Sequence, residues 1–231
     1  MKNTLSDQKF KIFWDIDGTL LNTNGAAAIP FALAVSDFVG KDLVIDRKQL
    51  SGFTDFEIAR HLLSQVDIEP TMQDISKILD NYSDRLSSHL KKGKVEIVNN
   101  IELTLDRLYN RPGFEMAIGT GNFHRGAQIK LNHVGLLKYF KNENFFCASE
   151  QLWSRDAIIK QAKISLEQNQ IGVVIGDSPR DILSAHNSDL IAVAVPTGGH
   201  TALELAEFNP NFILEKSWSF EDLMQCLEKL L

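Results

Sequence analysis

The chain has few cysteines and no long apolar segment. Cys147 and Cys226 are the only cysteines among 231 residues, and two isolated thiols form neither a disulfide framework nor the ligand spacing of a zinc site. The first eleven residues are polar and contain no apolar secretion segment, and no later apolar run approaches the length that crosses a membrane. We therefore expect a cytoplasmic protein that makes no membrane contact.

Acidic residues outnumber basic ones, 30 to 24. The formal net charge is −6, which argues against a broad surface for nucleic acid or anionic membranes but leaves room for a local basic pocket. The histidines stand alone, and the sequence shows no Ser-His-Asp or Cys-His constellation and no internal repeat. With 44% hydrophobic residues, the chain can bury the core of one large domain, or of a core with an insert.

One short apolar segment ends in two carboxylates. Residues 11–14 are rich in β-branched and aromatic side chains, which predicts a buried strand. Asp15 and Asp17 follow directly, and Gly18 favours a turn. Two carboxylates about 4 Å apart repel by roughly 4 kcal/mol at the effective dielectric of a protein, so they require a cation, a shared proton or a basic neighbour. Ligation by oxygen alone suits a hard ion such as Mg²⁺.

Helical periodicity dominates the region between Asn22 and Asn99. It predicts three helices and no convincing strand. The helices are expected to start at Pro30, Asp55 and Pro70 and to end before Gly40, at Leu63 and before Gly93. A helical block of this size between two strands is typical of an inserted helical bundle.

Helices and strands alternate in the remaining chain. We expect strands at 114–119, 145–148, 171–175 and 190–195, and helices at 103–109, 125–134, 156–166 and 179–186, with short segments at 201–206, 212–214 and 220–230 completing the series. This alternation predicts an α/β fold with a doubly wound parallel sheet. In such sheets ligands bind at the carboxyl ends of the strands.

Two further strands are predicted to end in polar groups. The strand at 114–119 leads into Thr120, Gly121 and Asn122, which supply hydroxyl and N–H donors for a phosphoryl oxygen. The strand at 171–175 leads into Asp177 and Asp181, with Pro179 marking a helix start between them. Capping of that helix explains one of these acids, but not both.

These strand ends resemble three motifs of the haloacid dehalogenase (HAD) superfamily, most of whose members are Mg²⁺-dependent phosphohydrolases. Asp15-x-Asp17-Gly18-Thr19 matches the first motif, Thr120 the second, and Gly176-Asp177-x-x-x-Asp181 the fourth. The resemblance implies a Rossmann-like three-layer core with a parallel sheet, formed by residues 1–21 and 98–231. It also implies that residues 22–97 form a helical C1 cap like that of phosphoglycolate phosphatase-like members.

The third HAD motif is a Lys or Arg near a helix start. Many relatives have Lys-Pro there, and this chain does not. Arg155 is the best match, with Lys160 and Lys163 as alternatives on the same predicted helix. A basic group is needed physically, because a phosphate dianion that faces several aspartates must be held by positive charge.

The resemblance also implies a mechanism with two steps. Asp15 would attack phosphorus to form an aspartyl-phosphate, and Asp17 would protonate the leaving oxygen and later deprotonate a water. The implied Mg²⁺ ligands are Asp15, the backbone carbonyl of Asp17, Asp177 and, close by or through water, Asp181. The implied phosphate-binding groups are those of Gly18, Thr120, Gly121, Asn122 and Arg155. An acid at Asp17 argues for phosphate chemistry, because dehalogenases of the superfamily lack it.

The expected substrate is a small phosphorylated metabolite, handled by a monomer or homodimer. Residues 52–55 resemble a cap segment of the phosphoglycolate phosphatase group, so we expect Thr54, Asp55 and Arg60 to contribute to selectivity. Further candidates there are Asn22, Asn24, His61 and His124.

Three alternatives stay open. A β-phosphoglucomutase-like phosphomutase would use the same core with a different cap. A non-catalytic binding protein would usually have lost one of the four acids, and all four are present. Phosphonate hydrolysis would need a Schiff-base lysine from the cap, for which Lys41, Lys48 and Lys77 are candidates.

Overall fold

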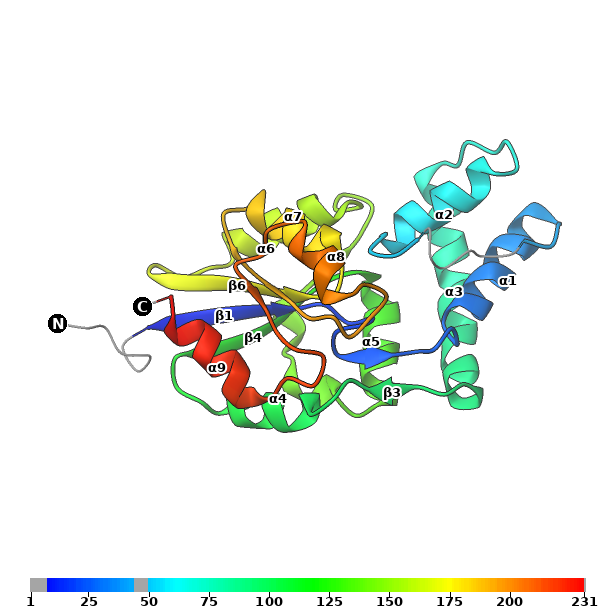
Figure 1. The fold of residues 1–231 in the computed structure, drawn as a ribbon. Coiled ribbons are helices and arrows are strands. Elements are labelled where there is room, and N and C mark those ends of the chain that lie inside the picture. Colours follow the sequence, from blue (N-terminus) through cyan, green and yellow to red (C-terminus); the bar gives the residue numbers. More distant parts are fainter. Residues whose placement is uncertain (1–7, 44–49, 231) are drawn as a thin grey trace.

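A parallel sheet of six strands forms the centre of the protein (Figure 1). The structure is a computed structural model and describes residues 8–43 and 50–230. The strand order is β5-β4-β1-β6-β7-β8, and each neighbouring pair is parallel. The strands are β1 (Lys9–Trp14), β4 (Phe114–Phe123), β5 (Phe145–Ala148), β6 (Gln170–Gly176), β7 (Ile191–Ala194) and β8 (Phe212–Ile213). The predicted α/β fold is confirmed.

Helices cover both faces of the sheet and make three layers (Figure 1). One face carries α4 (Ile101–Tyr109), α5 (His124–His133) and α9 (Phe220–Glu228); the other carries α6 (Arg155–Ile164), α7 (Pro179–His186) and α8 (Ala202–Ala206). Side chains alternate along β1, so Ile12 and Trp14 pack under the first set and Phe13 under the second. Burial on both faces explains the continuous apolar run of this strand.

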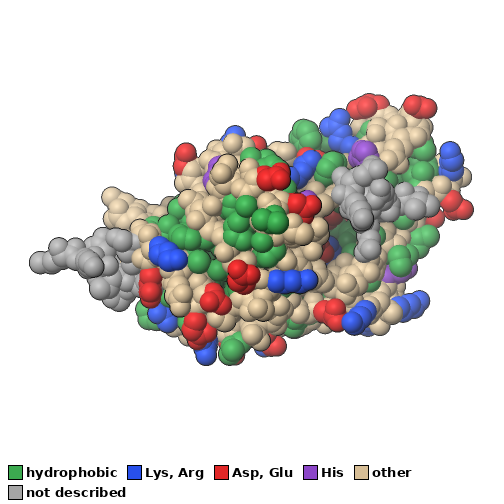
Figure 2. All heavy atoms as spheres, in the orientation of Figure 1, with side chains coloured by type: hydrophobic (Ala, Val, Ile, Leu, Met, Phe, Trp, Pro, Cys, Tyr) green, Lys and Arg blue, Asp and Glu red, His purple; other side chains and the backbone are tan. Residues whose placement is uncertain are grey.

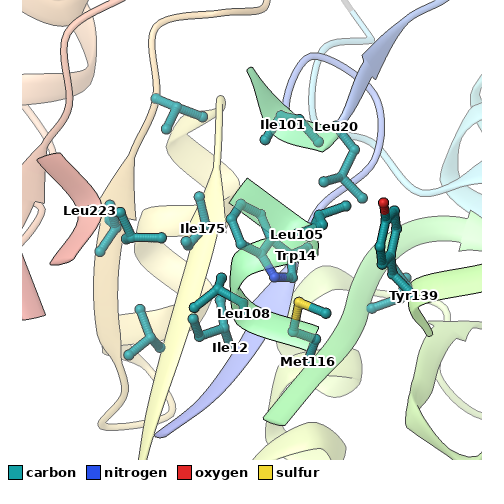
Figure 3. Close-up of a cluster of buried hydrophobic side chains, with 14 of the residues drawn as sticks. Ile12, Trp14, Leu20, Ile101, Leu105, Leu108, Met116, Tyr139, Ile175 and Leu223 are labelled. Carbon is teal, nitrogen blue, oxygen red and sulfur yellow. The ribbon is translucent and has the colours of Figure 1, made fainter. Parts of the chain in front are cut away.

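Trp14, the last residue of β1, lies in the middle of the larger apolar cluster (Figure 3). Its ring stacks on Trp218 with the centroids 6.3 Å apart. Leu105 of α4 and Ile175 of β6 belong to the same cluster, and all four side chains are 2% exposed or less. Such close packing fixes the point at which the chain leaves the sheet and the two aspartates begin.

The helical insert, which we define as residues 22–97, contains three helices in its described part, together with most of a second apolar cluster. The helices are α1 (Ala28–Val39), α2 (Asp55–Ser64) and α3 (Met72–Lys92). Reciprocal capping boxes start α2 at Thr54 and α3 at Thr71. The insert lies beyond the end of the sheet that is opposite the start of β1 and the end of α9 (Figure 1).

The prediction of no strand between Asn22 and Asn99 is wrong. Two strands of two residues each, β2 (Leu21–Asn22) and β3 (Glu96–Ile97), pair in antiparallel fashion. A strand of this length is too short to show alternation, so it leaves no sequence signal. The ribbon joins the two connections between the sheet and the helical insert. The predicted boundary at 21/22 falls within β2, and the one at 97/98 falls at the end of β3.

Strand β4 is longer than predicted. It continues past Gly119 to Phe123, with a register shift against β5 between Thr120 and Phe123. The sequence also gave no indication of two short 3₁₀ helices, Leu137–Tyr139 and Asn142–Asn144. Among the described residues, no helix combines the length and apolar character that crossing a membrane requires.

We expect Leu105→Ala to lower the free energy of unfolding by about 2–5 kcal/mol, because it opens a cavity beside Trp14. Leu103 lies on the same helix with 51% of its surface exposed. Leu103→Ala is therefore the matched control, with an expected change within about 0.5 kcal/mol. Urea denaturation of the two variants and the wild type measures the difference, and equal losses would contradict this account of the core.

Candidate active site

The end of β1 turns sharply beside the end of β6. The amide of Asp15 donates to the carbonyl of Ile175 at 3.0 Å, and the amides of Leu20 and Leu21 close the turn onto the carbonyl of Ile16. Gly18 adopts φ +84°, and a Cβ on it would lie 2.4 Å from the Asp177 carboxylate. Glycine is therefore required here, both for the left-handed backbone and for the close approach of the two acidic strand ends.

The end of β6 uses Asp181 in two ways. Its Oδ2 accepts hydrogen bonds from the Ser178 amide at 3.1 Å and the Ser178 hydroxyl at 2.6 Å, which caps α7. Its Oδ1 lies 3.0 Å from the guanidinium of Arg155. A Cβ on Gly176 would lie 2.2 Å from the Asp181 carboxyl carbon. The capping interaction thus holds one oxygen of Asp181 and directs the other into the site.

Asp15, Asp177 and Asp181 form a buried acidic cluster, with one carboxylate oxygen of each lying within 4.8 Å of the others. Burial raises the pKa of Asp15 to about 6, while Arg155 opposes the rise and Asp181 and Asp17 add to it. Burial also raises the pKa of Asp177 well above its ordinary value, with further contributions from Asp181 and Asp15. An all-oxygen cluster with this unrelieved repulsion fits a hard divalent cation such as Mg²⁺.

Arg155 supplies positive charge at the base of this cluster. It opens α6, and its guanidinium lies 3.1 Å from Oδ1 of Asp15 and donates to the Gly119 carbonyl at 3.1 Å. Burial alone would lower the pKa of Arg155, but Asp15 and Asp181 raise it above its ordinary value. The planar guanidinium thus holds two of the three acids in fixed positions.

The alternative lysines of this helix lie elsewhere. Lys160 is exposed, and Lys163 forms a surface ion pair with Asp189 at 2.9 Å. Of the three candidate bases for the third motif, the structure brings only Arg155 to the acidic cluster.

The end of β4 provides the groups that face Asp15 and Asp17. Thr120 is fully buried, and its hydroxyl is one of the groups that oppose the raised pKa of Asp15. The side-chain amide of Asn122 donates to Oδ2 of Asp17 at 2.8 Å and to the Thr120 hydroxyl at 3.0 Å. Gly121 faces the helical insert, where a Cβ would lie 3.0 Å from the Cα of Thr54. In this structure the Asn122 side chain is therefore engaged with Asp17.

Lys130 of α5 is a site residue that the sequence analysis missed. Its side chain is buried, and its ammonium group donates to Oδ2 of Asp17 and to Oδ1 of Asn122. Burial alone would lower the pKa of Lys130, but Asp17, with Tyr82 and Asp55, raises it above its ordinary value. One signal was present: Lys130 falls on the apolar face of its predicted helix, where a lysine is rarely buried without a partner.

A cavity of about 220 Å³ lies between the strand ends and the helical insert. Its floor includes Asp15, Asp17 and Arg155, and its roof includes Phe31 and Tyr82 of the helical insert. Figure 2 shows a hollow on this face of the molecule, between the sheet-containing part and the helical insert. The cavity brings together apolar walls and a charged floor, as in many sites for small metabolites.

Of the three expected selectivity residues, Asp55 lines this cavity. Burial raises its pKa to about 6, against the influence of Lys130, and its carboxylate accepts from the Phe123 amide at 3.0 Å. Thr54 instead caps α2 and donates to the Trp153 carbonyl at 2.6 Å. Arg60 is half-exposed and lies over the Trp153 ring, 5.3 Å from its centroid. The structure places neither Thr54 nor Arg60 in the cavity wall.

The other candidates for selectivity lie outside the wall as well. Asn22 donates to the Thr197 carbonyl, Asn24 to the Lys94 carbonyl and Glu96, His61 packs edge-on against Phe53, and His124 packs against Phe145. Lys41 and Lys77 are exposed, and Lys48 falls outside the described residues. In the part of the chain that is described, the lysine in the cavity wall is Lys130, from the sheet-containing part.

Besides the contacts of Thr54 and Asp55, further polar contacts join the helical insert to the sheet-containing part. Arg180, between the two acids of the fourth motif, donates to both carboxylate oxygens of Glu57 at 2.8 and 3.0 Å, and its guanidinium lies over the Phe53 ring at 4.0 Å. The Ser51 hydroxyl and Nε2 of His200 lie 3.1 Å apart. These contacts hold the insert over the acidic cluster, where it excludes water.

Comparisons with known proteins agree with this geometry. Residues 12–195 match the profile of a family described as Haloacid dehalogenase-like hydrolase. A phosphoglycolate phosphatase from Mannheimia succiniciproducens is 26% identical over 235 residues, which cover 95% of this chain and 99% of that protein.

Solved structures show the same fold. A predicted phosphatase from Clostridium acetobutylicum has a TM-score of 0.70 at 19% identity, with 96% of this chain and 99% of that chain covered. A predicted phosphoglycolate phosphatase from Haemophilus somnus has a TM-score of 0.66 at 19% identity, with 95% and 98% covered. Because the family profile spans most of the sequence, the chain belongs to the haloacid dehalogenase-like hydrolases, as its aspartate motifs predict.

Proposed function

We propose that the protein is a Mg²⁺-dependent phosphomonoester hydrolase of the phosphoglycolate phosphatase type, acting on a small organic phosphate through an aspartyl-phosphate. The observation that carries the proposal is the floor of the cavity. There Asp15 lies beside Arg155, with Asp177 in the same cavity wall and a second acid, Asp17, two residues further along the chain. Nucleophile, general acid and positive charge thus face one space of limited volume.

The chain's own residues account for the two steps of the reaction. Asp15 attacks phosphorus, and its carboxylate is oriented for this by Arg155. Asp17 has no contact with Arg155 among the described hydrogen bonds and ion pairs; its carboxylate faces Asn122 and Lys130. It is therefore free to protonate the leaving oxygen, and later to deprotonate the water that hydrolyses the intermediate.

Asp15, Asp177 and Asp181 would hold the metal, with the backbone carbonyl of Asp17 as a further ligand. When bound, Mg²⁺ shields the negative charge of the phosphoryl group and the carboxylates and orients the phosphoryl oxygens. Three acids opposite one guanidinium leave the cluster short of positive charge, which supports the assignment of these acids as metal ligands.

The cavity supports a small substrate. About 220 Å³ has room for a phosphate group and a few further atoms, and the helical insert closes over it as a cap. A relative that the whole chain matches is named a phosphoglycolate phosphatase, so 2-phosphoglycolate leads the substrate panel. We place the reaction in the cytoplasm, where the two cysteines, both free and buried, would stay reduced.

We expect the wild type to release phosphate from 2-phosphoglycolate and p-nitrophenyl phosphate with Mg²⁺, and Asp15→Asn to reduce kcat by about four orders of magnitude through loss of the nucleophile. Asp189→Asn is the matched control, since Asp189 is an exposed acid outside the cavity wall. Sugar phosphates complete the panel, and isomerisation of one without phosphate release would indicate a phosphomutase. Folded, Mg²⁺-loaded protein that turns over no phosphate ester would contradict the proposal.

We expect Mg²⁺ to bind more tightly as the pH rises through about 6, because Asp15 must lose its proton to act as a ligand. For the metal-free protein, folding stability is expected to change with pH in the opposite direction. A folded-state pKa raised from 3.8 to about 6 means that the folded form holds the extra proton, so the stability contributed by Asp15 is lost as the pH rises over that interval. Thermal unfolding with and without Mg²⁺ at pH values between about 4 and 8 measures both effects.

The control variant for this measurement is Asp177→Asn. It removes a predicted ligand, so its unfolding temperature is expected to respond little to Mg²⁺ at any of these pH values. A response to Mg²⁺ as large as that of the wild type would place the metal elsewhere.

A further inference from the structure

We propose that Lys130 is the positioning residue of the general acid–base: it holds the Asp17 carboxylate in the orientation that serves the leaving oxygen. This inference rests on the proposed function, because it assigns the support of the same reaction. Lys130 lies on α5, the helix that directly follows β4, and its ammonium group donates to the Asp17 carboxylate.

The first argument comes from how the Asp17 carboxylate is held. Lys130 and the side-chain amide of Asn122 both donate to the same oxygen, Oδ2. Asn122 also accepts from Lys130 through its own Oδ1, so the three side chains form a closed triangle. Fixing one oxygen at two points sets the plane of the carboxylate. The other oxygen, Oδ1, is left to carry the proton to and from the substrate.

The second argument comes from the difference in exposure. The side chain of Asp17 is 41% exposed and lines the cavity, whereas the side chain of Lys130 is 5% exposed. A surface ion pair loses much of its energy in restricting two mobile side chains. Here the lysine is already immobilised by burial, so forming the ion pair restricts mainly the side chain of Asp17. Lys130 therefore acts as a fixed point to which a more mobile acid is attached.

The third argument comes from the division of positive charge in the site. Arg155 contacts Asp15 and Asp181, whereas Lys130 contacts Asp17. The nucleophile and the general acid–base thus have separate cations, one from each face of the sheet. A lysine that only neutralised the acidic cluster would lie with Arg155 at the nucleophile.

The helical insert completes the surroundings of Lys130. Asp55 of α2 and Tyr82 of α3 lie close enough to its ammonium group for each to influence its pKa. The same two residues line the cavity. Lys130 is therefore fully enclosed only while the insert is docked, so the orientation of Asp17 depends on a closed site.

Leaving groups that differ in their need for a proton distinguish positioning from a structural role. An alkyl phosphate releases an alkoxide that must be protonated, so its kcat/KM depends on Asp17. p-Nitrophenyl phosphate releases a stable phenolate and needs little help. We expect Lys130→Met to lower kcat/KM about 100-fold or more for 2-phosphoglycolate or another hydrolysed alkyl phosphate, and less than about tenfold for p-nitrophenyl phosphate. Equal losses for the two substrates would overturn the proposal.

A double-mutant cycle tests whether the effect passes through Asp17. Asp17→Asn alone should show the same leaving-group pattern, and adding Lys130→Met to it should cause little further loss for the alkyl phosphate. If the loss of kcat/KM in the double variant equals the product of the losses in the two single variants, Lys130 acts independently of Asp17, which would overturn the inference. The control is Lys9→Met, since Lys9 pairs with Glu167 at 2.9 Å on the surface.

Folding and the parent proposal are checked separately. If thermal unfolding shows that Lys130→Met does not fold, Asn122→Ala carries the same comparison, because it opens the triangle while Lys130 keeps its ion pair with Asp17. The kcat/KM for the alkyl phosphate should again fall more than the kcat/KM for p-nitrophenyl phosphate, and equal losses would overturn the positioning role. A wild type that hydrolyses neither substrate would overturn the proposed function itself, and this inference with it. An active wild type with equal losses in the variants would overturn this inference alone.

Discussion

Repulsion between buried carboxylates is the constraint on which the rest of the site depends. Asp15, Asp177 and Asp181 meet at the edge of one parallel sheet, and burial keeps water from screening them. The fold maintains this arrangement by giving each acid fixed partners. Arg155 lies between Asp15 and Asp181, and Ser178 takes up the second oxygen of Asp181. The remaining deficit of positive charge is what makes the cluster suited to a divalent cation.

The same constraint explains the backbone around the cluster. Acidic strand ends approach this closely only where no side chain intervenes, as at Gly18 against Asp177 and Gly176 against Asp181. The helical insert then closes the space above, through Arg180 with Glu57 and the approach of Gly121 to Thr54. The buried carboxylates, their cations and the roof of the cavity are therefore parts of one packed arrangement, and a ligand has only the remaining volume.

Much of the fold and the acids of the site were predictable because their signals are local. A buried strand is apolar over consecutive residues, a helix repeats its apolar face, and glycine and proline mark the ends. The family resemblance added the order of the motifs and selected Arg155 on its position at a helix start. Strands β2 and β3 were not predictable, because two residues carry no periodicity and pair only when the flanking segments meet.

The sequence by itself determined the parallel sheet and the helical insert, and it identified Asp15, Asp17, Asp177 and Asp181 as candidate site residues. Only the tertiary structure decided which other side chains serve them. It brought Lys130 to Asp17, placed Thr54 at a helix cap and left Arg60 near the surface. The physical reason is that electrostatic and hydrogen-bonding partners are selected by distance in space. A distance between segments separated by more than a hundred residues is set by packing of the whole chain, and no local pattern records it.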